Sequence, residues 1–99
     1  MKSENNDGIM TVYLNGEIDH HTAGTIRNEA DMLLVKNNPY ELILDFSGVT
    51  FMDSSGVGLV IGRYKRAAMQ NCRVAVRGLK DRDRKILMMS GLQNKIEFR

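Results

Sequence analysis

Two short aliphatic segments, ELILDF at 41–46 and RVAVR at 73–77, constrain the fold of this chain most strongly. Both have the composition of strands inside a sheet, and ELILDF is apolar enough to be covered on both faces. Between them, apolar residues recur at the spacing of one helix face: Val57, Val60, Ile61, Tyr64 and Ala68. A strand–helix–strand connection is almost always right-handed and makes its strands parallel. The sequence therefore predicts an α/β domain with a mostly parallel sheet and helices packed on it.

The segments around these strands predict a further strand and two turns. MTVYL at 10–14 alternates in polarity and is rich in strand-forming residues, so it predicts a strand. The turn-forming pair Asn15-Gly16 predicts the end of that strand. Ser47-Gly48 predicts a second turn directly after ELILDF, before the central helix begins.

Two further helices are predicted on either side of the central unit. The first has capping residues, apolar residues at helical spacing and an Asn-Asn-Pro stop, in the order Asp19, Thr22, Ala23, Ile26, Ala30, Leu33, Leu34 and residues 37–39. The second covers 81–90, is charged and then apolar, and ends at Ser90-Gly91. KIEF at 95–98 predicts a short last strand.

The length and composition of the chain place these elements in one small domain. Residues 1–99 are expected to form a single domain, with residues 1–8 either disordered or the start of an edge strand. No apolar run approaches the about 20 residues that span a membrane, and the N-terminus lacks the apolar stretch of a signal peptide. We therefore expect a cytoplasmic protein that does not bind membranes. The single Cys72 excludes an internal disulfide and a Cys-rich metal site.

Charge is distributed unevenly along the chain, although the net charge is only +2. Residues 1–53 carry three basic and nine acidic side chains, whereas residues 54–99 carry eleven basic and three acidic ones. Such polarity either steers an acidic partner or belongs to ordinary solvated faces. The basic residues are not interleaved with aromatic ones and match no motif that reads nucleic acid, so direct binding to nucleic acid is not expected.

The segment FMDSSGVGLVIGRYK at 51–65 contains glycines that suggest a phosphate-binding loop. A Walker loop needs four residues between its two glycines, but five separate Gly56 from Gly62. The dinucleotide pattern G-x-G-x-x-G also fails by one residue. Because the N–H groups of such a loop must converge on one phosphate, this spacing argues against both nucleotide sites.

The same segment contains serines that suggest a nucleophile. Ser54 or Ser55 with His20 or His21 as the base would form a hydrolase site, but the G-x-S-x-G setting is absent. No third ligand at metal spacing accompanies the histidines. A small nucleotide-binding or hydrolytic α/β protein that uses the 53–62 loop is kept as the alternative function.

The central helix also places residues on the side away from its apolar stripe: Gly58, Leu59, Gly62, Lys65 and Arg66. Each glycine lowers helix stability by about 1 kcal/mol relative to alanine, so two glycines one turn apart need a reason. On an exposed face they would leave a shallow strip for another protein, with Leu59 as an exposed apolar anchor. The alternative is that the glycines make room for a neighbouring loop of the same chain.

Three segments of the chain resemble the bacterial anti-sigma factor antagonists, which are single-domain members of the STAS group shared with sulfate transporters and stressosome proteins. They are GEIDHHTAGTIRNEA at 16–30, LDFSGVTFMDSSGVGLVIGRYK at 44–65 and MSGL at 89–92. The D-S-S-G segment is characteristic of the antagonists, and DHHTA is similar to the sporulation type, which acts on the sigma-F pathway. The sequence ends one residue after KIEF, where relatives usually continue into a further helix.

The resemblance implies a protein that binds and exchanges partners, with no enzymatic activity and no cofactor, and monomeric when free. In relatives the unmodified antagonist captures an anti-sigma factor that is also a serine kinase, and this releases the sigma factor. The kinase phosphorylates the first serine of D-S-S-G, the pair separates, and a metal-dependent serine phosphatase removes the phosphate. A sensor subunit of a larger STAS assembly is a third interpretation.

The resemblance and the helix face together define an expected partner surface. Ser54 is the expected phosphorylation site, and Ser55 is the competing acceptor. Asp19 is expected to cap a helix or to contact the partner, and neither neighbouring histidine is expected to bind a metal. The residues expected at the partner surface are Asp19, His20, His21, Asp53, Ser55, Gly56, Gly58, Leu59 and Gly62.

Overall fold

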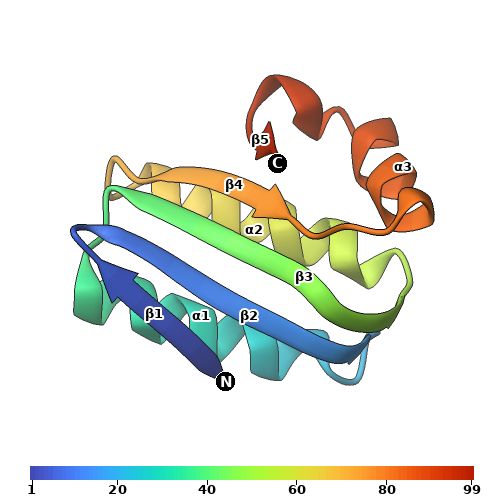
Figure 1. The fold of residues 1–99 in the computed structure, drawn as a ribbon, viewed down its shortest axis with the longest axis horizontal. Helices are drawn as coiled ribbons and strands as arrows, with labels where there is room; N and C mark the ends of the chain where they lie inside the picture. The colour runs from blue at the N-terminus through green and yellow to red at the C-terminus, as the bar shows by residue number, and fades with distance from the viewer.

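The computed structural model describes residues 1–99 and has an α/β architecture (Figure 1). Its elements are β1 (Lys2–Asn6), β2 (Ile9–Ile18), α1 (Ala23–Asn37), β3 (Glu41–Met52), α2 (Ser55–Ala68), β4 (Arg73–Arg77), α3 (Asp81–Met89), the 3₁₀ helix η1 (Leu92–Asn94) and β5 (Glu97–Phe98). The strands lie in chain order in one sheet, where β1 is antiparallel to β2 and all other neighbours are parallel. The predicted α/β class and the mostly parallel sheet are confirmed.

The two long helices cover the same face of the sheet. Figure 1 shows α1 and α2 behind the strands, whereas α3 and η1 lie beyond β4. Alternate residues of the three central strands point toward α1 and α2 and form the core: Met10, Val12, Leu14, Leu42, Leu44, Phe46, Val74 and Val76. None of the helices has the length and apolar character needed to cross a membrane.

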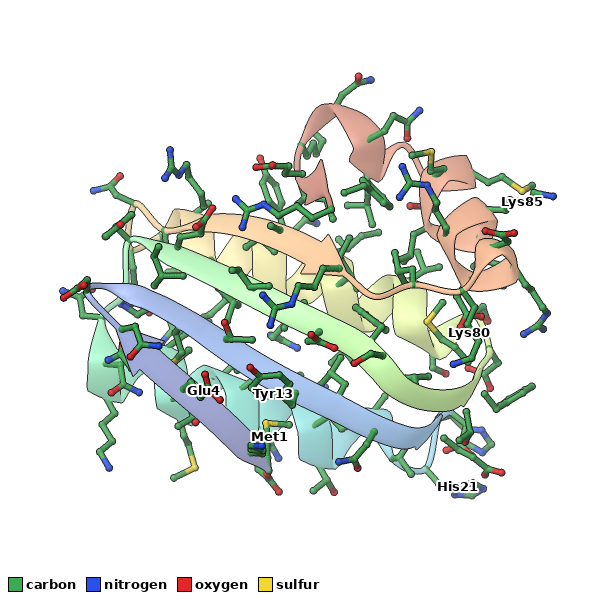
Figure 2. All side chains as sticks on the ribbon, in the orientation of Figure 1. Met1, Glu4, Tyr13, His21, Lys80 and Lys85 are labelled. Atoms are coloured by element: carbon green, nitrogen blue, oxygen red, sulfur yellow. The ribbon has the colours of Figure 1, made fainter.

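The opposite face of the sheet carries a polar row instead of a second helical layer. Tyr13, Asp45 and Arg77 are cross-strand neighbours on β2, β3 and β4, and Figure 2 shows Tyr13 on this near face. Arg77 Nε donates to Asp45 Oδ2 at 2.7 Å, and its Nη2 donates to the Tyr13 hydroxyl at 3.4 Å. Burial acts to raise the pKa of Asp45, but the Ser47 hydroxyl and Arg77 outweigh it and lower that pKa. All six residues of ELILDF are buried, although helices cover only one of their faces.

The two turns predicted beside the strands are wrong. Asn15-Gly16 lies inside β2, Ser47-Gly48 lies inside β3, and Asn15 pairs with Gly48. The pairing register shifts just before Asn15 and just after Gly16. A Cβ atom at Gly48 would lie 2.9 Å from Asn15 Cβ and 3.1 Å from the carbonyl oxygen of Leu14. The turn-forming residues therefore mark an irregularity where two continuous strands approach closely.

The C-terminal region is less regular than the sequence predicts. The helix expected at 81–90 is α3, which ends at Met89, and Gly91 follows with a φ of 85°. The strand expected over KIEF is shorter, because only Glu97–Phe98 pairs with β4. Ile96 is buried in the core, so it anchors the segment between η1 and β5.

Gly56 and Gly58 of α2 have different surroundings, so the same substitution should have opposite effects at the two positions. A Cβ atom at Gly56 would lie 2.3 Å from Sδ of the fully buried Met52, whereas one at Gly58 would meet no atom within 4 Å. Gly56→Ala should destabilise the domain by about 1–3 kcal/mol. Gly58→Ala should stabilise it by up to about 1 kcal/mol, because alanine favours the helix. Urea unfolding measures both effects, and equal changes would contradict this assignment.

Candidate functional site

The loops that follow β2 and β3 lie side by side at one end of the sheet. Ile18 and Met52, the last residues of these strands, are paired, and the Asp53 N–H donates to the Ile18 carbonyl oxygen at 3.1 Å. Figure 2 shows His21 and Lys80 at this end of the molecule. The structure therefore brings residues 19–21 and the D-S-S-G segment to the same end of the sheet.

Asp19 and Thr22 bond to each other in the turn that leads into α1. The Asp19 carboxylate accepts hydrogen bonds from the N–H groups of His21, at 2.8 Å, and Thr22, at 3.0 Å. In return, the Asp19 N–H donates to the Thr22 hydroxyl at 3.0 Å. The pKa of Asp19 is lowered, chiefly because the Thr22 N–H stabilises the charged carboxylate. These bonds close the turn that leads into α1, whose N-cap residue is Thr22. A capping role of Asp19 and its contact with a partner both stay predictions.

The two histidines lie exposed at this end, with ring centroids 3.9 Å apart. The chain contains no group of three or more His, Cys, Asp and Glu side chains that could hold a metal ion. Cys72 is buried elsewhere in the core, and burial raises the pKa of its thiol to about 11. This thiol is therefore protonated and weakly nucleophilic at neutral pH.

The serines of the D-S-S-G segment differ in exposure. Asp53 Oδ1 accepts a hydrogen bond from the Ser55 N–H at 2.8 Å, so Asp53 caps the start of α2. Ser54 occupies the N-cap position by its backbone, but its hydroxyl makes no capping bond and the residue is exposed. Ser55 is half-buried. Ser54 is therefore the more exposed of the two serines.

A groove of about 610 Å³ runs between α1 and α2 beside these serines. Nine residues from the two helices and the preceding loop line it: His20, Ala23, Gly24, Arg27, Ser55, Gly58, Leu59, Gly62 and Arg63. A Cβ atom at Gly58 or Gly62 would meet no atom within 4 Å. The alternative that these glycines make room for a loop of the same chain is therefore wrong. Because the two glycines have no side chains, the α2 wall of the groove projects less into it.

Two of the expected contact residues lie elsewhere than predicted. Leu59 is 5% exposed and belongs to the core, so the expectation of an exposed apolar anchor is wrong. Gly56, the second of these residues, is buried beneath the Met52 side chain. Ala68 was expected to face inward, not to contact a partner, and it is exposed. Leu59 is buried because α2 packs against α1 as well as against the sheet, which buries a wider face than the apolar stripe indicates.

An ion pair that the sequence analysis missed joins α2 to α1 beside the groove. Arg63 is 5% exposed, and its Nη2 donates to Asp31 Oδ2 of α1 at 3.2 Å. Its Nε lies 2.8 Å from Asp31 Oδ1, an ionic contact with an unfavourable N–H direction, and its buried Nη1 has no partner. Burial lowers the pKa of Arg63, and Asp31 opposes that shift. A basic residue in an apolar helix was the only sequence signal, since the two partners lie 32 positions apart.

The α1 wall of the groove was also missed. Ala23, Gly24 and Arg27 share one side of α1, with His20 just before them. A helix-wheel argument applied to 23–37, as it was to α2, would have identified the small residues and the arginine on one face. It would not have shown that this face borders α2.

Comparisons with known proteins agree with this fold and this sequence pattern. The STAS domain family matches residues 1–99. An anti-sigma F factor antagonist of Paenibacillus polymyxa is 34% identical over 92 residues, which cover 93% of this chain and 79% of that protein.

Two solved structures of anti-sigma factor antagonists are similar over almost the whole chain. SpoIIAA in its unphosphorylated form has a TM-score of 0.76 and 27% identity, covering 99% of this chain and 86% of that one. The Bacillus cell fate determinant SpoIIAA in the phosphorylated form has a TM-score of 0.76 and 29% identity, covering 99% and 89%. The family match, the identity and the shared fold lead to one assignment. This chain belongs to the STAS domain family, among the anti-sigma factor antagonists.

Proposed function

We propose that this protein switches partners through the groove and the adjoining Ser54. In the unphosphorylated form it captures an anti-sigma factor that is also a serine kinase, and thereby releases a sigma factor for transcription. The observation that carries the proposal is the open, glycine-lined groove directly beside an exposed serine hydroxyl without a capping bond. The similarity to anti-sigma F factor antagonists supports sporulation as the process.

The partner's kinase activity, on this proposal, acts on Ser54. Phosphorylation ends the complex, and a serine phosphatase restores the binding form. The existence of SpoIIAA structures in unphosphorylated and phosphorylated forms supports a modification of this kind. The protein itself acts as a binding protein and contributes no catalytic group, cofactor or metal. It acts in the cytoplasm as a monomer when free, and makes no direct contact with nucleic acid.

The expected contact residues divide into three roles on this proposal. The residues that border the groove contact the partner, together with the exposed His21: they are His20, Ser55, Gly58, Gly62 and the small exposed part of Leu59. Asp19 holds the turn before α1 and Asp53 holds the start of α2 through their hydrogen bonds, and their outer carboxylate oxygens reach the partner. Gly56 serves the interior, because it is buried.

Two observations weigh against a nucleotide site or a hydrolytic site in the 53–62 loop. The Asp53 carboxylate already occupies the start of α2, where a bound phosphate would lie, and like charges repel. Gly58 and Gly62 lie inside a helix, so their N–H groups do not converge on a ligand as those of a phosphate loop do. Calorimetry with ATP and with GTP discriminates, since heat from stoichiometric binding would favour the nucleotide function.

Incubation with the cognate anti-sigma factor kinase and ATP tests the assignment of Ser54. Wild type and Ser55→Ala should each accept one phosphate, and peptide mass should place it on Ser54. Ser54→Ala should bind the kinase and accept none. The half-buried Ser55 is the matched control, because it carries the same hydroxyl one residue further into α2. Phosphate that persists in Ser54→Ala and vanishes in Ser55→Ala would overturn the assignment.

A further inference from the structure

Hydrogen bonds join the start of α3 to β3, the strand that precedes Ser54 in the chain. Lys80, directly before α3, donates from Nζ to the Val49 carbonyl oxygen of β3. Arg82 Nη1, in the first turn of α3, donates to the Met52 carbonyl oxygen at 3.2 Å. These bonds bring two cations from a segment about 30 residues later to the end of β3. Arg82 is the one that reaches the last residue of the strand.

Arg82 keeps N–H donors that make no polar contact in this position. Its side chain is 64% exposed, and its guanidinium lies over the Phe51 ring with 5.6 Å between Cζ and the ring centroid. Nη1 also lies 3.6 Å from Asp83 Oδ1, so one nitrogen makes the polar contacts of this side chain. A guanidinium has five N–H donors in a planar fork, which leaves Nε and Nη2 available to an anion.

We infer that Arg82 is the residue that pairs with the phosphate of phosphorylated Ser54 and holds it against the start of α3. The inference rests on the proposed phosphorylation of Ser54. The Ser54 Cα lies at most about 7.6 Å, two Cα steps, from the Cα of Met52, whose carbonyl Arg82 already contacts. A phosphoserine side chain and a rotation of the Arg82 side chain span the remaining gap, and Arg–phosphate pairs are commonly bidentate.

The charges around Ser54 favour the pairing of Arg82 with the phosphate. The start of α2 favours an anion, whereas the Asp53 carboxylate beside it repels the phosphate. Asp83 competes for the same guanidinium, but its contact with Arg82 is long, at 3.6 Å. A dianionic phosphate attracts Arg82 more strongly than a neutral carbonyl oxygen does. The guanidinium therefore exchanges the Met52 carbonyl for the phosphate once Ser54 is modified.

Phosphorus NMR on the full chain tests the inference without a kinase, with phosphoserine incorporated at position 54 during translation. The second pKa of phosphoserine, about 6, is followed by pH titration. A cation in contact favours the dianion, so that pKa should be higher in Arg82→Gln than in the unsubstituted chain by about half a unit or more. Arg84→Gln is the matched control, because Arg84 lies over the Phe98 ring, at 5.3 Å. It should leave the value unchanged.

The chain without substitutions provides a second readout. The nitrogen–proton signal of Arg82 Nε should shift over the pH range in which the phosphate titrates, and should not do so in the unphosphorylated protein. The pairing would be overturned if the phosphoserine pKa were unchanged in Arg82→Gln or rose equally in Arg84→Gln. It would also be overturned if the Nε signal of Arg82 did not shift as the phosphate titrates. Failure of the proposed function is distinct, since it would appear as undiminished binding of the phosphoserine protein to the anti-sigma factor.

Discussion

Phosphoserine at position 54 should weaken binding to the anti-sigma factor by at least about 100-fold and leave the thermal stability of the free domain nearly unchanged. In the free domain Ser54 is exposed, so the phosphate stays hydrated there. The start of α2 favours the phosphate by about 0.3–1 kcal/mol, whereas each pair of unit charges between the phosphate and the Asp53 carboxylate costs about 1 kcal/mol in water at a separation of about 4 Å. The proposed pair between Arg82 and the phosphate offsets part of this repulsion, so the net change in the free domain is small.

The complex differs because the partner would remove water from the phosphate. Leaving a charge buried without compensation costs several kcal/mol, and each 1.4 kcal/mol is about tenfold in affinity. Ser54→Asp should show a smaller loss in the same direction, and Ser54→Ala should bind as wild type does. Calorimetric titration with the anti-sigma factor and thermal unfolding of the free proteins measure both quantities.

Asn28→Asp is the control for added charge, because Asn28 is exposed on α1 outside the residues that line the groove. It should keep wild-type affinity. Phosphoserine 54 that binds with unchanged affinity would refute the switch. A phosphorylated domain that unfolds many degrees lower would instead indicate that the modification acts through the fold.

Gly62→Glu should reduce affinity for the anti-sigma factor by about 100-fold or more without lowering stability. The glycine borders the groove, and a Cβ atom there would meet no atom within 4 Å, so the larger side chain projects into the space that the partner fills. The partner would have to bury a carboxylate or be held away from the groove, and either effect costs several kcal/mol. In the free protein, glutamate favours the helix over glycine by up to about 1 kcal/mol.

Ala68→Glu is the matched control for Gly62→Glu, since Ala68 is exposed on the same helix and does not line the groove. It adds the same charge and should leave affinity near that of wild type. Affinity and thermal unfolding are measured on the same samples. Gly62→Glu that unfolds several degrees lower and keeps its affinity would show that this glycine serves the interior rather than the partner.

The order and type of most elements were determined by the sequence alone. The aliphatic density of 41–46 and 73–77 is a local pattern, and these segments lie in β3 and β4 of the structure. The helical spacing from Val57 is also local, and it corresponds to α2. The hydrogen-bonded turn at Asp19 also depends on a few adjacent residues. Ser54 was identified by resemblance of the D-S-S-G segment, and the structure adds that its hydroxyl is exposed and makes no capping bond.

Only the tertiary structure decided which surfaces border the site. Apolar spacing records which side of a helix avoids water, but it does not record which neighbour covers that side. Packing of α1 on α2 buries Leu59 and pairs Arg63 with Asp31, and packing of α3 brings Arg82 to the end of β3. The pairs Arg63–Asp31 and Arg82–Met52 span 32 and 30 positions, so they form only when complete elements pack together. The groove exists for the same reason: its walls come from two helices that no local pattern places side by side.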